Sequence, residues 1–140
     1  MLASDRPQHP DRPEAHRRVL AQRTQTQEHV AEAEAILRSG RAFYYEMLHK
    51  TWDETKAKGR ASTETRRDLR LAITHAARSA ARTVDLMYNL GGGTSVYKGS
   101  ALQRIFRDVH VATQHMQVAT PTMETVGRHM LGLDGDYSQL

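Results

Sequence analysis

Three places in this sequence carry residue types that could do chemistry: a glycine run, an arginine-containing segment and a small set of histidines. The glycine run comprises Gly91, Gly92 and Gly93. One glycine is enough to end a helix, so three in succession indicate a backbone that bends sharply or lies against something flat or anionic. A flexible connector is the alternative, because the run matches neither a phosphate-binding loop nor a dinucleotide-binding fingerprint.

The segment from Arg104 to His110 (RIFRDVH) places two arginines on one expected helix. Arg104 and Asp108 are four residues apart and can pair along that helix, whereas Arg107 points elsewhere. An arginine just inside a helix that follows a glycine-rich turn can meet a phosphate. A structural salt bridge explains the same residues equally well.

The histidines specify less. His110 and His115 are five residues apart, which separates them by about 140° around a helix and argues against one metal ion held by this pair. His75, on another expected helix, could approach either of them, but no spacing specifies such a contact. A lone histidine on a helix face is more often a packed or surface residue than a catalyst. The residues alone therefore predict no metal site and leave His115 without a role.

The composition narrows the class of protein that must position these residues. A chain of 140 residues suits one domain, and a hydrophobic content of 39% requires amphipathic elements for the core. No segment approaches the ~18 apolar residues of a membrane span. The polar N-terminus, residues 1–18, contains no apolar stretch of the kind found in signal peptides. We therefore expect a cytoplasmic protein with no membrane partner.

Cysteine content and charge exclude further classes. Cysteine is absent, which rules out disulfides, thiolate metal ligands and a thiol nucleophile. The net charge is +4, but acidic and basic residues are interleaved, as in Glu64, Arg66, Arg67 and Asp68. Faces of mixed charge are typical of solvated helices, so we expect no nucleic-acid partner.

A first helix is expected after a polar tail. Residues 1–23 hold three of the four prolines and few apolar side chains, which predicts a tail or linker before a helical domain over residues 24–140. Thr24 and Gln27 have capping-box spacing, so the first helix should begin there and end near Gly59. Its expected apolar stripe follows helical spacing: it comprises Val30, Ala33, Leu37, Phe43, Tyr44, Met47, Leu48 and Trp52.

Three further helices are expected. The second is capped by Ser62 or Thr63, carries an alanine-rich face that allows a close neighbour, and ends at the glycine run. The third begins after Ser100, and Pro121 starts the fourth, which runs to Gly132. The apolar face expected for the third helix comprises Leu102, Ile105, Phe106, Val109, Ala112 and Met116. No β pattern is present, so the expected fold is an all-α antiparallel four-helix bundle.

The stretch from Leu90 to Gly132 (LGGGTSVYKGSALQRIFRDVHVATQHMQVATPTMETVGRHMLG) resembles the C-terminal helical domain of the acyl-CoA dehydrogenase superfamily. The resemblance is greatest to the type-2 branch, which contains two-component flavin-dependent monooxygenases. VAEAEAILRSGRAFYYE and LRLAITHAARSAARTVDLMYNLGGG are similar to the first two helices of that domain. The resemblance covers roughly residues 24–133.

The resemblance implies a role for each candidate residue. Gly91, Gly92 and Gly93, together with Arg104 or Arg107, fall where family members bring backbone and basic groups near the flavin nucleotide, commonly that of a neighbouring subunit. His115 falls where the monooxygenases place a histidine beside the flavin ring, to assist the reaction with oxygen. An imidazole can donate to a developing anion and move a proton near neutral pH.

One departure from the family favours oxygen chemistry over desaturation. Many acyl-CoA dehydrogenases carry a glutamate base in a Tyr-Glu-Gly-Thr segment at about this point, whereas His115-Met116-Gln117 offers no carboxylate. Removal of a proton next to a thioester needs such a base within reach. Since the glutamate lies elsewhere in some members, a dehydrogenase remains the second interpretation within the family.

The resemblance also implies cofactors and partners. The expected function is the C-terminal domain of a flavin-dependent oxidoreductase that uses FAD or reduced FMN and forms part of the flavin site and the oligomer interface. The family's other two domains, an N-terminal helical and a central β-domain, have no counterpart upstream of Thr24. The expected partners are further copies of the chain, in a tetramer, and the missing flavin-binding domains or a flavin reductase. The alternative is a catalytically inactive helical oligomerisation or interaction module.

Overall fold

The computed structural model describes residues 20–140, and most of the expected tail, residues 1–19, lies outside this range. The described part contains α2 (Thr24–Lys58), α3 (Thr63–Gly91), a 3₁₀ turn, η1 (Gly92–Val96), α4 (Ala101–Thr113) and α5 (Thr120–Met130). No strand occurs between residues 20 and 140. The all-α class and the four main helices are therefore confirmed.

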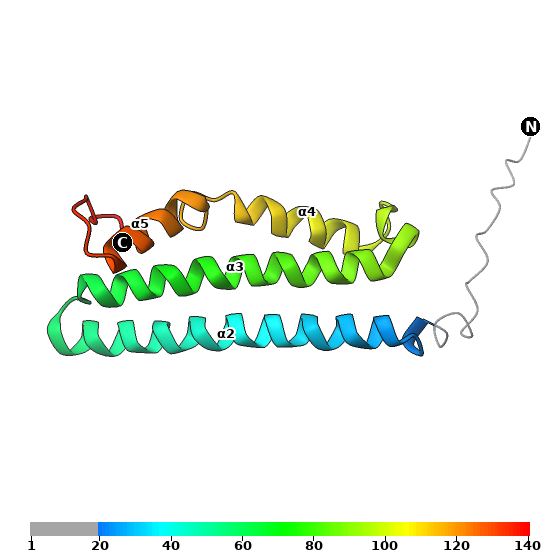
Figure 1. Cartoon of the computed structure of the whole chain (residues 1–140), viewed down its shortest axis with the longest axis horizontal. Coiled ribbons are helices and arrows are strands. Elements are labelled where there is room, and N and C mark those ends of the chain that lie inside the picture. The colour runs from blue at the N-terminus through cyan, green and yellow to red at the C-terminus, as the bar shows by residue number, and fades with distance from the viewer. Residues whose placement is uncertain (1–19) are drawn as a thin grey trace, which may run out of the picture.

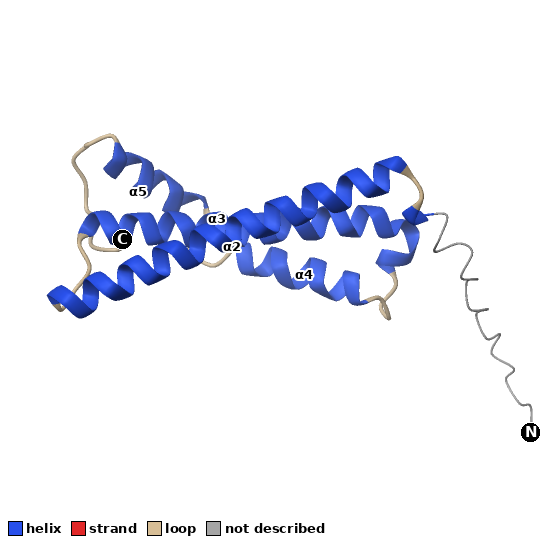
Figure 2. Ribbon diagram, turned by 90° about the horizontal axis from the view of Figure 1, so that it is seen from below, coloured by secondary structure: helices blue, strands red, loops and turns tan. Residues whose placement is uncertain are grey.

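The helices form three layers with α3 in the middle (Figure 1). α2 lies antiparallel to α3 along one side, and α4 and α5 follow one another along the other side. Seen from below, α4 and α5 diverge to opposite sides of the crossing α2–α3 pair (Figure 2). Within the described residues, every contact between two α-helices involves α3. The bundle is consequently open, because α2 touches neither α4 nor α5.

α2 and α3 pack closely because small residues meet where they cross. A Cβ atom added to Gly40 would lie 2.9 Å from the Cβ atom of Ser79 on α3. Ala72 and Ala81, on the alanine-rich face of α3, are buried. The close approach expected from that face is therefore present, and it forms the main core of the molecule.

The boundaries of α3 follow from local backbone chemistry. Gly59 ends α2 with a φ of 80°, and its N–H donates to the carbonyl of Thr55. Ser62 caps α3, where its Oγ accepts from the N–H of Thr65 at 3.2 Å. At the other end, Gly92 has a φ of 54°, a left-handed conformation that L-residues rarely adopt. The predicted stops and the Ser62 cap are confirmed.

The predicted capping box at the start of α2 is wrong. Arg23 occupies the N-cap position, and no side chain bonds the free amides there. The Gln27 side chain turns back and donates to the carbonyl of Ala21 at 3.0 Å. The helix therefore begins one residue earlier than the capping box requires, and Gln27 bonds to the preceding segment instead of to the N-cap residue.

The predicted apolar stripe of α2 is only half correct. Ala33 and Met47 are buried against α3, but several large members of the stripe are exposed to solvent; these are Val30, Leu37, Leu48 and Trp52. α4 shows the same pattern, since none of its residues is fully buried. Each of these helices carries more apolar surface than its contact with α3 covers.

The last ten residues return over α3 without forming a helix. Arg66 donates to the carbonyl of Leu140 at 2.9 Å, and Arg70 donates to the carbonyl of Gln139 at 2.9 Å. The side chain of Leu140 is buried. These contacts hold the segment after α5 against the end of α3 where that helix begins.

Candidate functional site

The three glycines of the run meet different surroundings. Gly91 is closely packed, since an added Cβ would lie 2.1 Å from Oγ of Ser95, which is buried and donates to the carbonyl of Tyr88 at 2.8 Å. Gly92 and Gly93 are exposed, and no atom lies within 4 Å of an added Cβ at either position. Gly91 therefore serves the internal packing of the turn, while Gly92 and Gly93 present bare backbone outward.

The two arginines lie on the first two turns of α4, and both are exposed. Arg107 forms an ion pair with Asp108 at 3.6 Å, so the predicted Arg104–Asp108 pair is wrong. Arg107 pairs with Asp108 although the two are adjacent, because both side chains extend freely into solvent. Arg107 also lines a shallow groove with the aromatic rings of Tyr88 and Phe106. Both guanidinium groups are accessible to an anionic ligand.

His115 lies in the loop after α4 rather than on the helix, which ends at Thr113. The predicted helical face that extended to Met116 is therefore too long. The N–H of His115 still donates to the carbonyl of Ala112 at 3.2 Å, and the imidazole Nδ1 faces the N–H of Gln117 at 3.3 Å. The side chain is exposed, so its ring can reach a ligand outside this chain.

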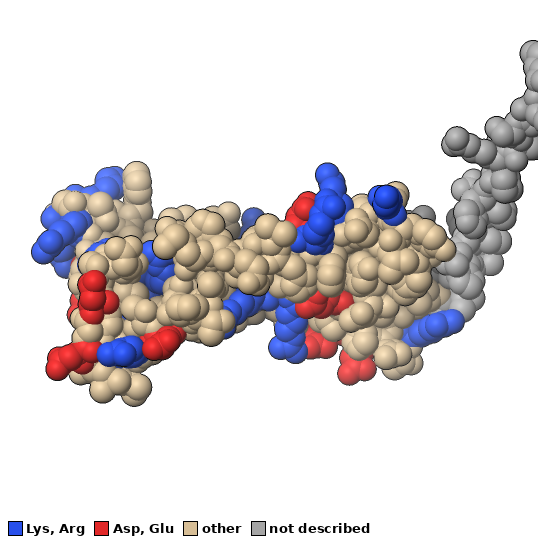
Figure 3. All heavy atoms as spheres, turned by 90° about the horizontal axis from the view of Figure 1, so that it is seen from above, with Lys and Arg blue, Asp and Glu red and all other residues tan. Residues whose placement is uncertain are grey.

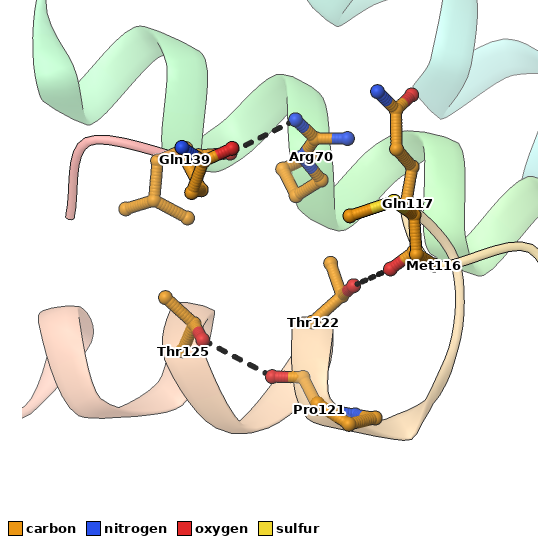
Figure 4. Close-up of a pocket in the computed structure, with 8 residues that line it drawn as sticks. Arg70, Met116, Gln117, Pro121, Thr122, Thr125 and Gln139 are labelled. Carbon is orange, nitrogen blue, oxygen red and sulfur yellow. Dashed lines mark hydrogen bonds between the residues drawn. The ribbon is translucent and has the colours of Figure 1, made fainter. Parts of the chain in front are cut away.

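The His115 loop is held from both ends. The amides of Val118 and Ala119 donate to the carbonyl of His115 at 2.9 and 3.0 Å, and the side chain of Val118 is buried. The Thr122 hydroxyl donates to the carbonyl of Met116 at 3.0 Å (Figure 4). The same close-up shows Gln117 near Arg70 of α3. A short loop with this many backbone bonds can present an imidazole in a defined position.

The predicted site residues therefore fall into two groups at opposite ends of α4. The glycine turn precedes the helix, and His115 follows it. α4 has 13 residues, so the two groups are separated by about 20 Å along its axis. Exposed backbone and two guanidinium groups toward one end, and an exposed imidazole at the other, fit an extended ligand with a phosphate and a planar ring.

One pair near His115 was missed by sequence reasoning. Nε2 of His110 lies 2.8 Å from Oδ1 of Asp85 on α3, with both side chains partly exposed. The ring of His110 also packs on Phe106, at a centroid distance of 4.5 Å. The two partners are 25 residues apart on different helices, and no motif relates them. Only the register of α4 against α3 brings them together.

The third candidate histidine, His75, lies away from His110 and His115. His75 packs edge-on against Phe43 of α2, with ring centroids 6.2 Å apart. It thus belongs to the α2–α3 interface, whereas His110 and His115 belong to the α4 side of α3. No group of three potential metal-ligating side chains occurs within residues 20–140.

The face that carries α4 and α5 shows no concentrated charge. On the face that carries α4 and α5, basic and acidic side chains are mixed, and the middle of the face is largely uncharged (Figure 3). A basic stripe that could follow a nucleic-acid backbone is therefore not seen on this face. No helix among the described residues has the length and apolar content needed to cross a membrane.

Comparison with known proteins defines the class of this molecule. The model of the family described as acyl-CoA dehydrogenase, C-terminal domain, matches residues 5–120. The chain is 39% identical to indole-3-acetate monooxygenase of Pseudomonas putida, over 81% of the chain and 29% of that protein. It is 33% identical to indole-3-acetate monooxygenase of Acinetobacter baumannii, with the same coverage. These are matches to the helical domain of flavin-dependent oxidoreductases.

The chain belongs to the acyl-CoA dehydrogenase superfamily, as a C-terminal domain of its type-2 branch. It spans less than a third of the length of the two monooxygenases that it matches.

Proposed function

We propose that this chain forms one wall of the flavin site of a flavin-dependent monooxygenase that acts on an aromatic acid such as indole-3-acetate. The observation that carries the proposal is the His115 loop. It presents an exposed imidazole on a backbone fixed by hydrogen bonds, and its residues 114–119 contain no carboxylate. The names of the two relatives support oxygen chemistry and the class of substrate.

The residues of this chain would divide the work along α4. His115 would stand beside the flavin ring, where its imidazole can donate a hydrogen bond or hold a proton for the reacting oxygen. Gly92 and Gly93 would allow the backbone to approach the nucleotide, and Arg104 or Arg107 would pair with its phosphate. The bound reduced flavin itself would supply the electrons that activate oxygen.

The length of α4 bears on how the flavin is shared. Since about 20 Å separates the glycine turn from His115, the two groups cannot both touch one flavin ring. The turn would instead contact the far end of FAD, or a flavin bound mainly by a neighbouring subunit. We therefore propose a homo-oligomer, a tetramer as in the family. We also propose that it works in the cytoplasm, and that a separate reductase supplies reduced flavin when the cofactor is FMN.

A domain exchange tests this function directly. The segment of the Pseudomonas putida monooxygenase that matches this chain would be replaced by the corresponding residues of the chain. We expect the chimera to bind reduced flavin and to consume indole-3-acetate. The His115→Ala chimera should bind flavin within about twofold of the parent but lose at least about tenfold in product, with hydrogen peroxide released instead.

Two results would overturn the proposal. A folded chimera that binds no flavin would favour the helical interaction module without catalysis. Unchanged product yield in the His115→Ala chimera would remove the role proposed for this residue. A matched control is His49→Ala, since His49 is an exposed histidine on α2, away from α4.

A further inference from the structure

α4 packs along α3 without a fully buried side chain. None of its residues is fully buried, and its exposed side chains include Ile105 and Val111. Among the described residues, the contact between Asp85 and His110 is the one polar side-chain link between α3 and α4. Apolar packing alone lets a helix slide, so this polar link contributes to fixing the position of α4 along α3.

A stack of aromatic rings supports the same pair. Tyr88 of α3 packs on Phe106 at a centroid distance of 4.4 Å, and Phe106 packs on His110 at 4.5 Å. The imidazole is thus fixed from one side by a ring and from its edge by a carboxylate. An ionised carboxylate only accepts hydrogen bonds, so Nε2 of His110 must carry the proton of this bond.

The end of α4 transmits the position of His110 to the loop. The hydroxyl of Thr113 donates to the carbonyl of His110 at 2.8 Å, and the N–H of Gln114 donates to the carbonyl of Val111 at 3.1 Å. His115 follows directly and bonds to Ala112. A displacement of His110 would move the last turn of α4 and the imidazole of His115 with it.

We propose that Asp85 and His110 are a positioning pair, which fixes the end of α4 on α3 and so places His115 against the reacting atoms. The inference rests on the proposed function of His115. It assigns no chemistry to His110, whose Nε2 is already engaged with Asp85. An error of about 1 Å in a reacting group can reduce a rate by about a hundredfold, so a positioning pair can matter as much as a catalytic residue.

Other charged groups near His110 do not duplicate this link. Arg78 and Arg82 of α3 line one groove beside His110, and Arg107 of α4 lines another. Arg82 is paired with Glu32 of α2 at 2.7 Å. These side chains are all cationic, so Asp85 is the carboxylate available to His110 within these two grooves.

The test uses four variants of the active chimera. His110→Leu removes the donor, and His110→Lys supplies another N–H donor on a side chain long enough to reach Asp85. Exchange of the two partners, Asp85→His with His110→Asp, restores the link in reverse. His49→Leu is the matched control on α2. A positioning role requires a donor at position 110 or the reversed link, whereas a catalytic role requires the imidazole itself.

We expect His110→Leu to lower product per flavin oxidised by about tenfold to a hundredfold, with a matching rise in hydrogen peroxide and flavin affinity within about twofold. His110→Lys and the exchanged pair should recover most of the yield, and His49→Leu should equal the parent. The inference is overturned if His110→Leu is as active as the parent, or if His110→Lys and the exchanged pair are as impaired as His110→Leu.

Hydrogen exchange separates this inference from the proposed function. In the 140-residue chain itself, His110→Leu should speed exchange of the amides of residues 105–119 by about tenfold or more, whereas amides of α2 should be unchanged. His110→Lys should restore slow exchange. An inactive parent chimera would contradict the proposed function. Equal exchange rates of these amides in wild type and His110→Leu would contradict the positioning role of Asp85 and His110.

Discussion

Gly91 and Gly93 lie in the same run but have different surroundings, so substitution of each by alanine should have a different effect. An alanine Cβ at Gly91 would overlap Oγ of Ser95, and moving that hydroxyl would break its bond to Tyr88. We expect Gly91→Ala to destabilise the isolated chain by about 1–3 kcal/mol. Gly93→Ala meets open space and should change stability by less than about 0.5 kcal/mol. Urea unfolding followed by circular dichroism measures both.

The same pair tests the contact with a nucleotide. Gly93→Ala should weaken flavin binding in the chimera although it leaves the fold intact, because the added methyl group stands on the exposed backbone. Equal stability losses for the two substitutions would show that the turn is not packed as described. Unchanged flavin affinity in the Gly93→Ala chimera would show that this backbone does not approach the cofactor.

The sequence predicts the exposed candidate site residues but not the residues that they contact. The glycine run was noticed because it exceeds what a helix stop requires, and His115 because it resembles a family residue. The pairing of Asp85 with His110 was not predictable. It depends on how far α4 slides along α3, and helical periodicity does not contain that quantity.

Helix boundaries were predictable wherever a single residue decides them. Gly59 and Gly92 adopt left-handed conformations, and Ser62 supplies an acceptor for a free amide. The end of α4 was misplaced because apolar spacing continues to Met116 although the hydrogen-bond ladder stops at Thr113. Spacing predicts which face is apolar, whereas the end of the helix depends on the loop that Val118 anchors.

The junction between α2 and α3 gives a prediction on pH. Hydrogen bonds from Thr65, Lys58 and Ser62 lower the pKa of Glu54 from 4.5 to about 2. A carboxylate with a lowered pKa stabilises the fold above pH 4.5 and loses this contribution as the pH falls toward 2. Glu54→Gln should therefore lower the melting temperature at pH 7 and flatten its decline between pH 4.5 and 2.

Thermal melts of the isolated chain across this range provide the measurement. Glu46→Gln is the matched control, because Glu46 is an exposed glutamate on the same helix. The control should follow the wild-type profile. A Glu54→Gln variant with the wild-type slope would mean that the carboxylate does not brace the start of α3.

Residues 20–140 form an open arrangement in which α3 is the helix covered on two sides. The apolar residues of α2 were predicted to form one stripe, but the stripe is wider than the contact with α3, and its outer half is exposed. Periodicity shows that a face is apolar and not what covers it. Since the relatives are more than three times as long as the matched segment, we expect the outer half to be covered in the chimera.

Leu37 and Leu48 allow that expectation to be tested against folding of the chain itself. Both lie on the outer half of the α2 stripe, with exposed fractions of 43% and 37%. Replacement of both by Gln should leave the melting temperature of the isolated chain within about 2 °C of wild type, because the polar side chains remain in water.

In the chimera, the same change should cost about 1–2 kcal/mol per subunit, since apolar surface that the assembly buries is lost. Differential scanning calorimetry of both proteins, with light scattering for subunit number, gives the comparison. Leu131→Gln, at an exposed apolar residue after α5, is the control. Equal destabilisation of the two proteins would place the outer half of the stripe in the core of this chain, and no effect in the chimera would mean that it stays exposed in the enzyme.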